Sequence, residues 1–210
     1  MATGDIAQDP TPNAYQQFHD VMDRLKIPVY CNAGNHDDVD AIKRYALGQN
    51  ITMPGYLLSS NWLVIFVRSL VKGQGYGLVD QSELDRVTRL LDENPKRHVL
   101  ILTHHHPLSI DSAWIDRIRL INGEWFLERL AEHPQVRGMA FGHIHQRYDE
   151  VFKHIQLMGT PSTCIQFKPK AEKFELDALT PGYRHISLLP NGEIETEVKF
   201  LTAKNLRLIA

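Results

Sequence analysis

The chain has 210 residues, enough for one domain with a sizeable core or for two small ones. Its net charge of −2 excludes a general basic surface for nucleic acid or a membrane, and its 43% hydrophobic content is ordinary for a globular protein. The two cysteines, Cys31 and Cys164, exclude a disulfide framework and a Cys-x-x-Cys metal pair. We see neither a signal segment nor a run that would cross a bilayer, and therefore expect a cytoplasmic protein.

The first third of the chain is expected to contain one helix and short strands. Residues 13–25 place apolar side chains at helical spacing. Residues 27–31 have the composition of a short buried strand, followed by a turn at Gly34. A long run rich in Val, Ile and aromatic residues over 61–70 indicates a further strand.

The middle and the end of the chain differ in pattern. A helix is predicted over 82–94, with Ser82 as its cap, and a second helix over 123–134. A continuous apolar run over 98–103 is typical of a strand buried on both faces, and a further strand is predicted over 136–141, after the second helix. Alternating runs after residue 148, with Asn191-Gly192 as a turn, predict antiparallel hairpins. Together these patterns favour a single layered α/β domain over residues 1–210, with β-sheets packed between helices.

Polar clusters directly follow three of the predicted strands. The first runs from Asn35 to Asp38, the second is the triplet His104–His106, and the third contains His143 and His145. In open α/β sheets ligands bind outside the carboxyl ends of the strands, so we expect the clusters to converge on one rim. Asp, Asn and His without Cys favour ions such as Mn²⁺, Fe²⁺ or Zn²⁺ over a thiolate-rich structural zinc site.

Each cluster, taken alone, also has a simpler interpretation. Residues 35–38 are compatible with an ordinary turn, since Asn and Asp tolerate such backbones. The histidine triplet is compatible with a solvated surface, and His143 with His145 is compatible with a hydrogen-bonded core pair. Asp5 would be unremarkable by itself.

In combination, the motifs resemble a known family. Gly4-Asp5, residues 34–37, residues 104–107 and residues 142–145 are similar to four of the five sequence blocks of calcineurin-like metallophosphoesterases, in the same order and with matching separations. The surrounding sequence, from Thr3 to about Phe200, resembles the bacterial class III cyclic-AMP phosphodiesterase branch.

The resemblance implies a centre with two divalent metal ions, with Fe²⁺ or Mn²⁺ expected and Zn²⁺ as the alternative. Asp5 would bridge the two ions, and Asn35, His104 and His143 would complete the first site. His145 would bind the second ion together with Asp5. The metal ligand of the triplet is His104 by analogy with the family, with His105 as the alternative if the strand ends one residue later.

The same resemblance implies hydrolysis of 3′,5′-cyclic AMP to 5′-AMP, a small-molecule reaction in which a hydroxide bridging the metals attacks phosphorus. His36 would be the general acid for the leaving alkoxide, and Asp37 would orient His36, although a capping role suits Asp37 equally well. Asn35, His36 and His145 would also contact the substrate. Alternatives are a broader phosphodiesterase or phosphomonoesterase, and a catalytically silent protein that binds metal or nucleotide.

One family block is missing from the sequence. The first block, an Asp-x-His on the first strand, has no counterpart before Thr3. We therefore expect an N-terminally truncated fold with a four-ligand site, a two-ligand site, weak binding of the second ion and impaired activity. Exposed sheet edges would favour association into a homo-oligomer.

The residues that would contact the base are not identified by any pattern. His106, Trp114, Arg117 and Gln146 lie close to the motifs in sequence. Packing or a solvated loop is the favoured explanation for each of them.

Overall fold

A six-stranded mixed sheet forms the centre of the computed structural model, which describes residues 1–202. Its strand order is β3-β4-β5-β6-β8-β7, with β4, β5, β6 and β8 parallel and the two edge strands antiparallel. The strands are β3 (Tyr56–Leu58), β4 (Trp62–Phe66), β5 (His98–Thr103), β6 (Val136–Phe141), β7 (Tyr148–Phe152) and β8 (Ile155–Gly159). The predicted strands over 98–103 and 136–141 are confirmed to the residue.

Helices cover one face of this sheet. They are α3 (Gln81–Glu93), the short α4 (Ala113–Asp116) and α5 (Gly123–Ala131). Buried side chains such as Val87, Leu91, Phe126 and Leu127 join the sheet residues in the largest core cluster. Burial of each such side chain typically contributes about 1.5–3 kcal/mol, so this layer is the main source of stability.

The cap of α3 differs from the prediction. Asp80, not Ser82, is the N-cap, and its carboxylate accepts a hydrogen bond from the main-chain N–H of Glu83 at 2.8 Å. Ser82 lies inside the first turn and donates its hydroxyl to Asp80. Both residue types are good caps, so local sequence did not distinguish two positions only two residues apart.

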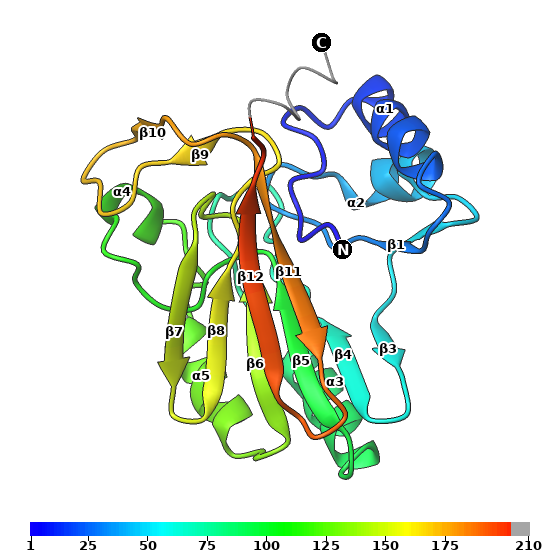
Figure 1. The fold of residues 1–210 in the computed structure, drawn as a ribbon, viewed down its shortest axis with the longest axis vertical. Helices are drawn as coiled ribbons and strands as arrows, with labels where there is room; N and C mark the ends of the chain where they lie inside the picture. The colour runs from blue at the N-terminus through cyan, green and yellow to red at the C-terminus, as the bar shows by residue number, and fades with distance from the viewer. Residues whose placement is uncertain (203–210) are drawn as a thin grey trace.

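A β-hairpin covers the other face of the sheet. Strands β11 (Gly182–Leu188) and β12 (Ile194–Phe200) pair antiparallel around the predicted Asn191-Gly192 turn. Figure 1 shows this hairpin in front of the sheet, with α3 and α5 behind it. Ile186 and Ile194 pack on the sheet, where Trp62 donates its indole N–H to the carbonyl of Leu189 at 2.7 Å. The layered α/β fold and the hairpin are confirmed, and the helices of the main core lie on one face only.

The N-terminal segment packs at one side of the sheet (Figure 1). It contains α1 (Pro12–Asp23), β1 (Val29–Tyr30), α2 (Val39–Ala41), the π-helical turn η1 (Ile42–Ala46) and β2 (Ile51–Thr52). The predicted strand over 27–31 exists as β1, but it pairs in parallel with β2 and not with the large sheet. Ala2 forms a parallel β-bridge to Cys31, the residue that follows β1. The start of the chain, which leads to Asp5, therefore lies beside the end of β1.

A small hairpin completes the fold. Strands β9 (Gln166–Phe167) and β10 (Leu176–Asp177) are antiparallel and lie near α4 (Figure 1). Within residues 1–202, no helix has the length and apolar content required to span a bilayer.

Candidate metal centre

Four of the five predicted metal ligands lie in direct contact. The Nε2 atom of His104, just after β5, lies 3.0 Å from Oδ1 of Asn35 and 3.1 Å from Nδ1 of His143, just after β6. Oδ2 of Asp5 lies 3.3 Å from the same nitrogen. Loops that follow β1, β5 and β6 therefore converge with the N-terminal segment, as the strand-end argument predicts.

Hydrogen bonding sets the protonation of His104. Its Nδ1 lies 2.9 Å from the carbonyl oxygen of Thr3, which can only accept, so Nδ1 carries a proton and donates. In the neutral ring Nε2 then has a lone pair. This lone pair faces the carboxylate of Asp5 and the amide oxygen of Asn35, so the pocket is rich in acceptors and fits a cation. A proton donated to Thr3 is also the arrangement usual for histidine ligands of metals.

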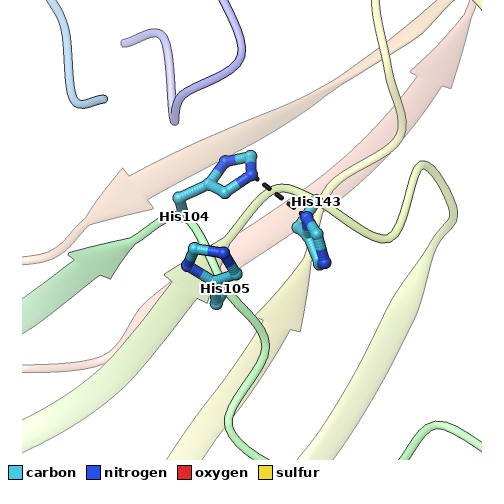
Figure 2. Close-up of side chains that lie close together, drawn as sticks. All are labelled: His104, His105 and His143. Atoms are coloured by element: carbon cyan, nitrogen blue, oxygen red, sulfur yellow. Dashed lines mark hydrogen bonds between the residues drawn. The ribbon is translucent and has the colours of Figure 1, made fainter. Parts of the chain in front are cut away.

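His105 is the other member of the triplet near this centre. His104, His105 and His143 place ligand atoms within 4.8 Å of one another, and Figure 2 shows their rings side by side. However, Nδ1 of His105 lies 2.8 Å from the Ser69 hydroxyl, and Nε2 lies 3.2 Å from the carbonyl of Gly75. Both ring nitrogens of His105 thus contact groups outside the predicted ligand set, whereas Nε2 of His104 contacts three predicted ligands. His104 therefore suits a ligand role better than His105.

His145 lies on the same loop as His143 but makes a separate set of contacts. Its Nδ1 lies 2.9 Å from the carbonyl oxygen of Ile165, so this nitrogen donates and Nε2 keeps the lone pair. Burial lowers the pKa of His145, partly offset by that hydrogen bond and by the charge of Asp5. The ring is therefore neutral near pH 7, which is the state in which imidazole binds a metal.

The carboxylate of Asp5 remains ionised despite partial burial. Burial by itself would raise the pKa of Asp5, but His104, when its ring is protonated, and the His36 main-chain N–H lower it to about 2. That N–H donates to Oδ1 at 3.0 Å, while Oδ2 faces His104. The two oxygens thus point in different directions, as a bridging carboxylate requires.

His36 is half-buried beside this carboxylate. Its Nδ1 lies 3.2 Å from the main-chain carbonyl oxygen of Gln8 and 3.1 Å from the side-chain amide nitrogen of Gln8. These contacts use Nδ1 and leave Nε2 as the atom that can deliver a proton.

Asp37, predicted to orient His36, has other partners. Its buried carboxylate accepts hydrogen bonds from the main-chain N–H groups of Ile6, Ala7 and Gly34 and from the Tyr15 hydroxyl, at 2.9–3.3 Å. Burial raises the pKa of Asp37, although these N–H groups oppose the rise. The cap of the next element, α2, is Asp38, which accepts from the main-chain N–H of Ala41. The Asp37 carboxylate instead fastens the Asp5 loop to the Asn35 loop.

The backbone at the centre is strained. Asp5, His143 and His145 have φ values of 51°, 66° and 45°, a region that non-glycine residues enter at a cost of about 1–3 kcal/mol each. Gly34 permits the close approach, since a Cβ there would collide with the Asp5 carboxylate and with the ring of His104. Three of the seven non-glycine residues with positive φ in the described part of the chain are predicted ligands, which indicates that the fold holds these three in place for a function.

Several supporting residues were not predicted. Thr3 and Ser69 orient His104 and His105 through the hydrogen bonds described above. Asp116 accepts from His106 at 3.2 Å and from the main-chain N–H of Ile110 at 3.0 Å. The contacts of Thr3 and Ser69 join positions 101 and 36 residues apart in the chain, so no local pattern could have identified them.

The four candidates for base contact are dispersed. His106 and Gln146 are buried, and Arg117 is exposed at the surface. His106 stacks on His143, with ring centroids 5.6 Å apart. Trp114 is half-buried in a group of aromatic rings near His145.

The assembled centre, with Asp, Asn and His groups at the ends of parallel strands, defines a metal-dependent phosphoester hydrolase fold. The model of the calcineurin-like phosphoesterases matches residues 1–147, and the chain belongs to this family, whose members use divalent metals. It is 38% identical to the 3′,5′-cyclic adenosine monophosphate phosphodiesterase CpdA of Vibrio vulnificus, over 97% of this chain and 74% of that protein. The CpdA of Haemophilus influenzae is also 38% identical, over 95% of this chain and 73% of that protein.

Comparison with solved structures supports the fold. A protein described as GAP50, the anchor in the inner membrane complex of Plasmodium, aligns with a TM-score of 0.67 over 95% of this chain and 72% of its own. The identity is 13%, so the likeness concerns the fold alone.

Proposed function

We propose that the chain hydrolyses 3′,5′-cyclic AMP to 5′-AMP in a metal-dependent reaction. The observation that carries the proposal is the contact of Asp5, Asn35 and His143 with one nitrogen of His104. The similarity to two cyclic-AMP phosphodiesterases over nearly the whole chain supports the choice of substrate.

The ligand set is suited to divalent ions, with Fe²⁺ or Mn²⁺ expected and Zn²⁺ as the alternative. Asp5, Asn35, His104 and His143 would hold the first ion, and His145 with Asp5 the second. Such a pair of ions, when bound, lowers the pKa of a water molecule and neutralises charge on the phosphate.

The remaining steps belong to side chains of the protein. The amide of Asn35 and the ring of His145 would contact the phosphate oxygens and hold the ester in place. His36 would protonate the leaving ribose oxygen through Nε2, since a sugar alkoxide is too basic to leave unaided. Asp37 would act through the loop that carries Asn35 and His36, because its hydrogen bonds fix that loop against the Asp5 segment.

The test is hydrolysis by the purified chain after chelation and after addition of Mn²⁺ or Fe²⁺. Cyclic AMP, bis(p-nitrophenyl) phosphate and p-nitrophenyl phosphate are compared at equal enzyme concentration. We expect metal-dependent formation of 5′-AMP and preference for the diesters. A preference for the monoester, or two tightly bound metals without turnover, would refute the proposal.

Three broader expectations accompany this function. Residues 1–210 would act as one domain in the cytoplasm, where cyclic nucleotides are formed and degraded. Association of two or more copies is a further expectation, and sedimentation of the purified chain tests it. Neither nucleic acid nor a membrane is expected as a partner, given the net charge of −2.

A further inference from the structure

Three aromatic side chains form a cluster next to His145. Trp114 from α4 lies edge-on to Phe167 of β9, with ring centroids 4.9 Å apart. Phe174, in the loop between β9 and β10, lies 5.2 Å from Trp114 and 5.5 Å from Phe167. We call Trp114, Phe167 and Phe174 the aromatic cluster.

The cluster is fastened to His145 by three contacts. The ring of Phe167 stacks on the imidazole of His145 with centroids 4.1 Å apart and an interplanar angle of 4°. The main-chain N–H of Phe167 donates to the carbonyl of His145 at 3.1 Å, and His145 Nδ1 donates to the carbonyl of Ile165. The start of the β9–β10 hairpin is therefore placed relative to the metal centre by both side chain and main chain.

The outer part of the cluster faces solvent. Phe174 is 59% exposed, whereas Trp114 and Phe167 are half-buried. An exposed ring supported by two others is a preformed stacking surface. Because the neighbouring rings already hold it in place, stacking of a ligand on it would cost little further side-chain entropy. The ring of Phe174 is separated from His145 by no more than the Phe174–Phe167 and Phe167–His145 centroid distances taken together. This span is comparable to that from phosphate to base in a nucleotide.

We propose that the aromatic cluster binds the nucleobase of the substrate. The inference rests on the proposed function, because it places the phosphate of a cyclic nucleotide at His145 and the base against Phe174. Aromatic rings attract any base through its face, and a larger face gains more. The cluster would therefore select purine over pyrimidine cyclic nucleotides without distinguishing strongly between two purines.

The kinetic test compares two substrates of the same chemistry. One is cyclic AMP and the other is the 3′,5′-cyclic phosphate of 1-deoxyribose, which lacks a base. For Phe174→Ala we expect the ratio of kcat/KM for cyclic AMP to that for the base-free ester to fall about 5- to 100-fold, mainly through KM. Phe174→Tyr should restore the ratio, and Phe174→Leu should not, because leucine keeps apolar bulk without an aromatic face.

Leu179→Ala is the matched control, since Leu179 is 50% exposed and lies outside the cluster. Its substrate ratio should equal that of the unsubstituted chain. Equal losses for both substrates in Phe174→Ala, or rescue by leucine, would show that the ring only supports the hairpin and would overturn the proposal.

A binding measurement separates the two proposals. We expect 5′-AMP to quench the fluorescence of Trp114 and ribose 5-phosphate not to do so, with the signal lost in Trp114→Phe. Base-dependent quenching without turnover of cyclic AMP would refute the proposed function and sustain the nucleobase site. Suppose instead that cyclic AMP is hydrolysed, but 5′-AMP does not quench the fluorescence and Phe174→Ala does not change the substrate ratio. This result would sustain the proposed function and refute the nucleobase site.

Discussion

The Nε2 atom of His104 lies 3.1 Å from the Nδ1 atom of His143, although 39 positions separate the two residues in the chain. Since Nδ1 of His104 donates to Thr3, the His104 nitrogen in this pair carries a lone pair in the neutral ring. Both histidines are almost completely buried. Two imidazoles packed in this way beside Asp5 are stabilised when a cation lies between them.

His104→Ala is expected to abolish binding of the more tightly held metal ion, because it removes the ligand that contacts all three others. The measurement is the number of metal ions per chain after dialysis. The exposed His154 serves as the control, and His154→Ala should leave the metal content unchanged. Loss of metal in His105→Ala but not in His104→Ala would assign the ligand role to the neighbouring residue.

His36→Gln is expected to lower kcat for cyclic AMP by about 10²- to 10⁴-fold, the usual contribution of a general acid. The effect on bis(p-nitrophenyl) phosphate should be far smaller, because p-nitrophenolate leaves without a proton. The two turnover rates are measured with the same metal-loaded protein. A similar loss on both substrates would contradict the role of general acid.

Asp37→Asn is expected to destabilise the protein by about 1–3 kcal/mol, because an NH₂ group would replace one acceptor that faces main-chain N–H groups. The free energy of unfolding is measured in urea. Turnover should fall equally for cyclic AMP and bis(p-nitrophenyl) phosphate if Asp37 fixes the loop. If turnover instead falls strongly for cyclic AMP and little for bis(p-nitrophenyl) phosphate, as expected for His36→Gln, then Asp37 orients the His36 ring.

Glu83 is expected to make the stability of the protein dependent on pH. Its side chain is 3% exposed and pairs with Arg86 at 2.6 Å and with Arg68. Burial would raise the pKa of Glu83, but the hydrogen bonds from Arg86 and Arg68 and the charge of Arg86 lower it below 4.5. The stabilisation is therefore present above pH 4.5 and is lost as the pH falls through the lower folded-state value.

Glu83→Gln should accordingly cost about 2 kcal/mol at pH 7 and less at acidic pH, measured by urea unfolding at several pH values. Glu197→Gln is the control, since Glu197 is exposed and pairs with Lys199 at the surface. It should change the free energy of unfolding by less than about 0.5 kcal/mol. Equal effects of the two substitutions would show that burial of Glu83 is unimportant.

Local pattern was sufficient for the central elements of the fold. Strands over 98–103 and 136–141 appear in the structure with the predicted bounds. For 98–103 the signal was a continuous apolar run, which a strand buried on both faces needs. The Asn191-Gly192 turn likewise specified the β11–β12 hairpin from adjacent residues. The partner of β1 was not predictable in this way, since strand pairing joins residues distant in the chain.

For the site, the sequence by itself determined which side chains follow the strands, and so which groups gather at one rim. Only the tertiary structure decided their contacts: His104 faces Asn35 and His143, Asp37 binds loop N–H groups, and Phe167 stacks on His145. The physical reason is that hydrogen bonds and ring stacking depend on orientation and on distances of a few ångströms. These are set by the packing of β5, β6 and the hairpins together, and no single stretch of the chain contains them.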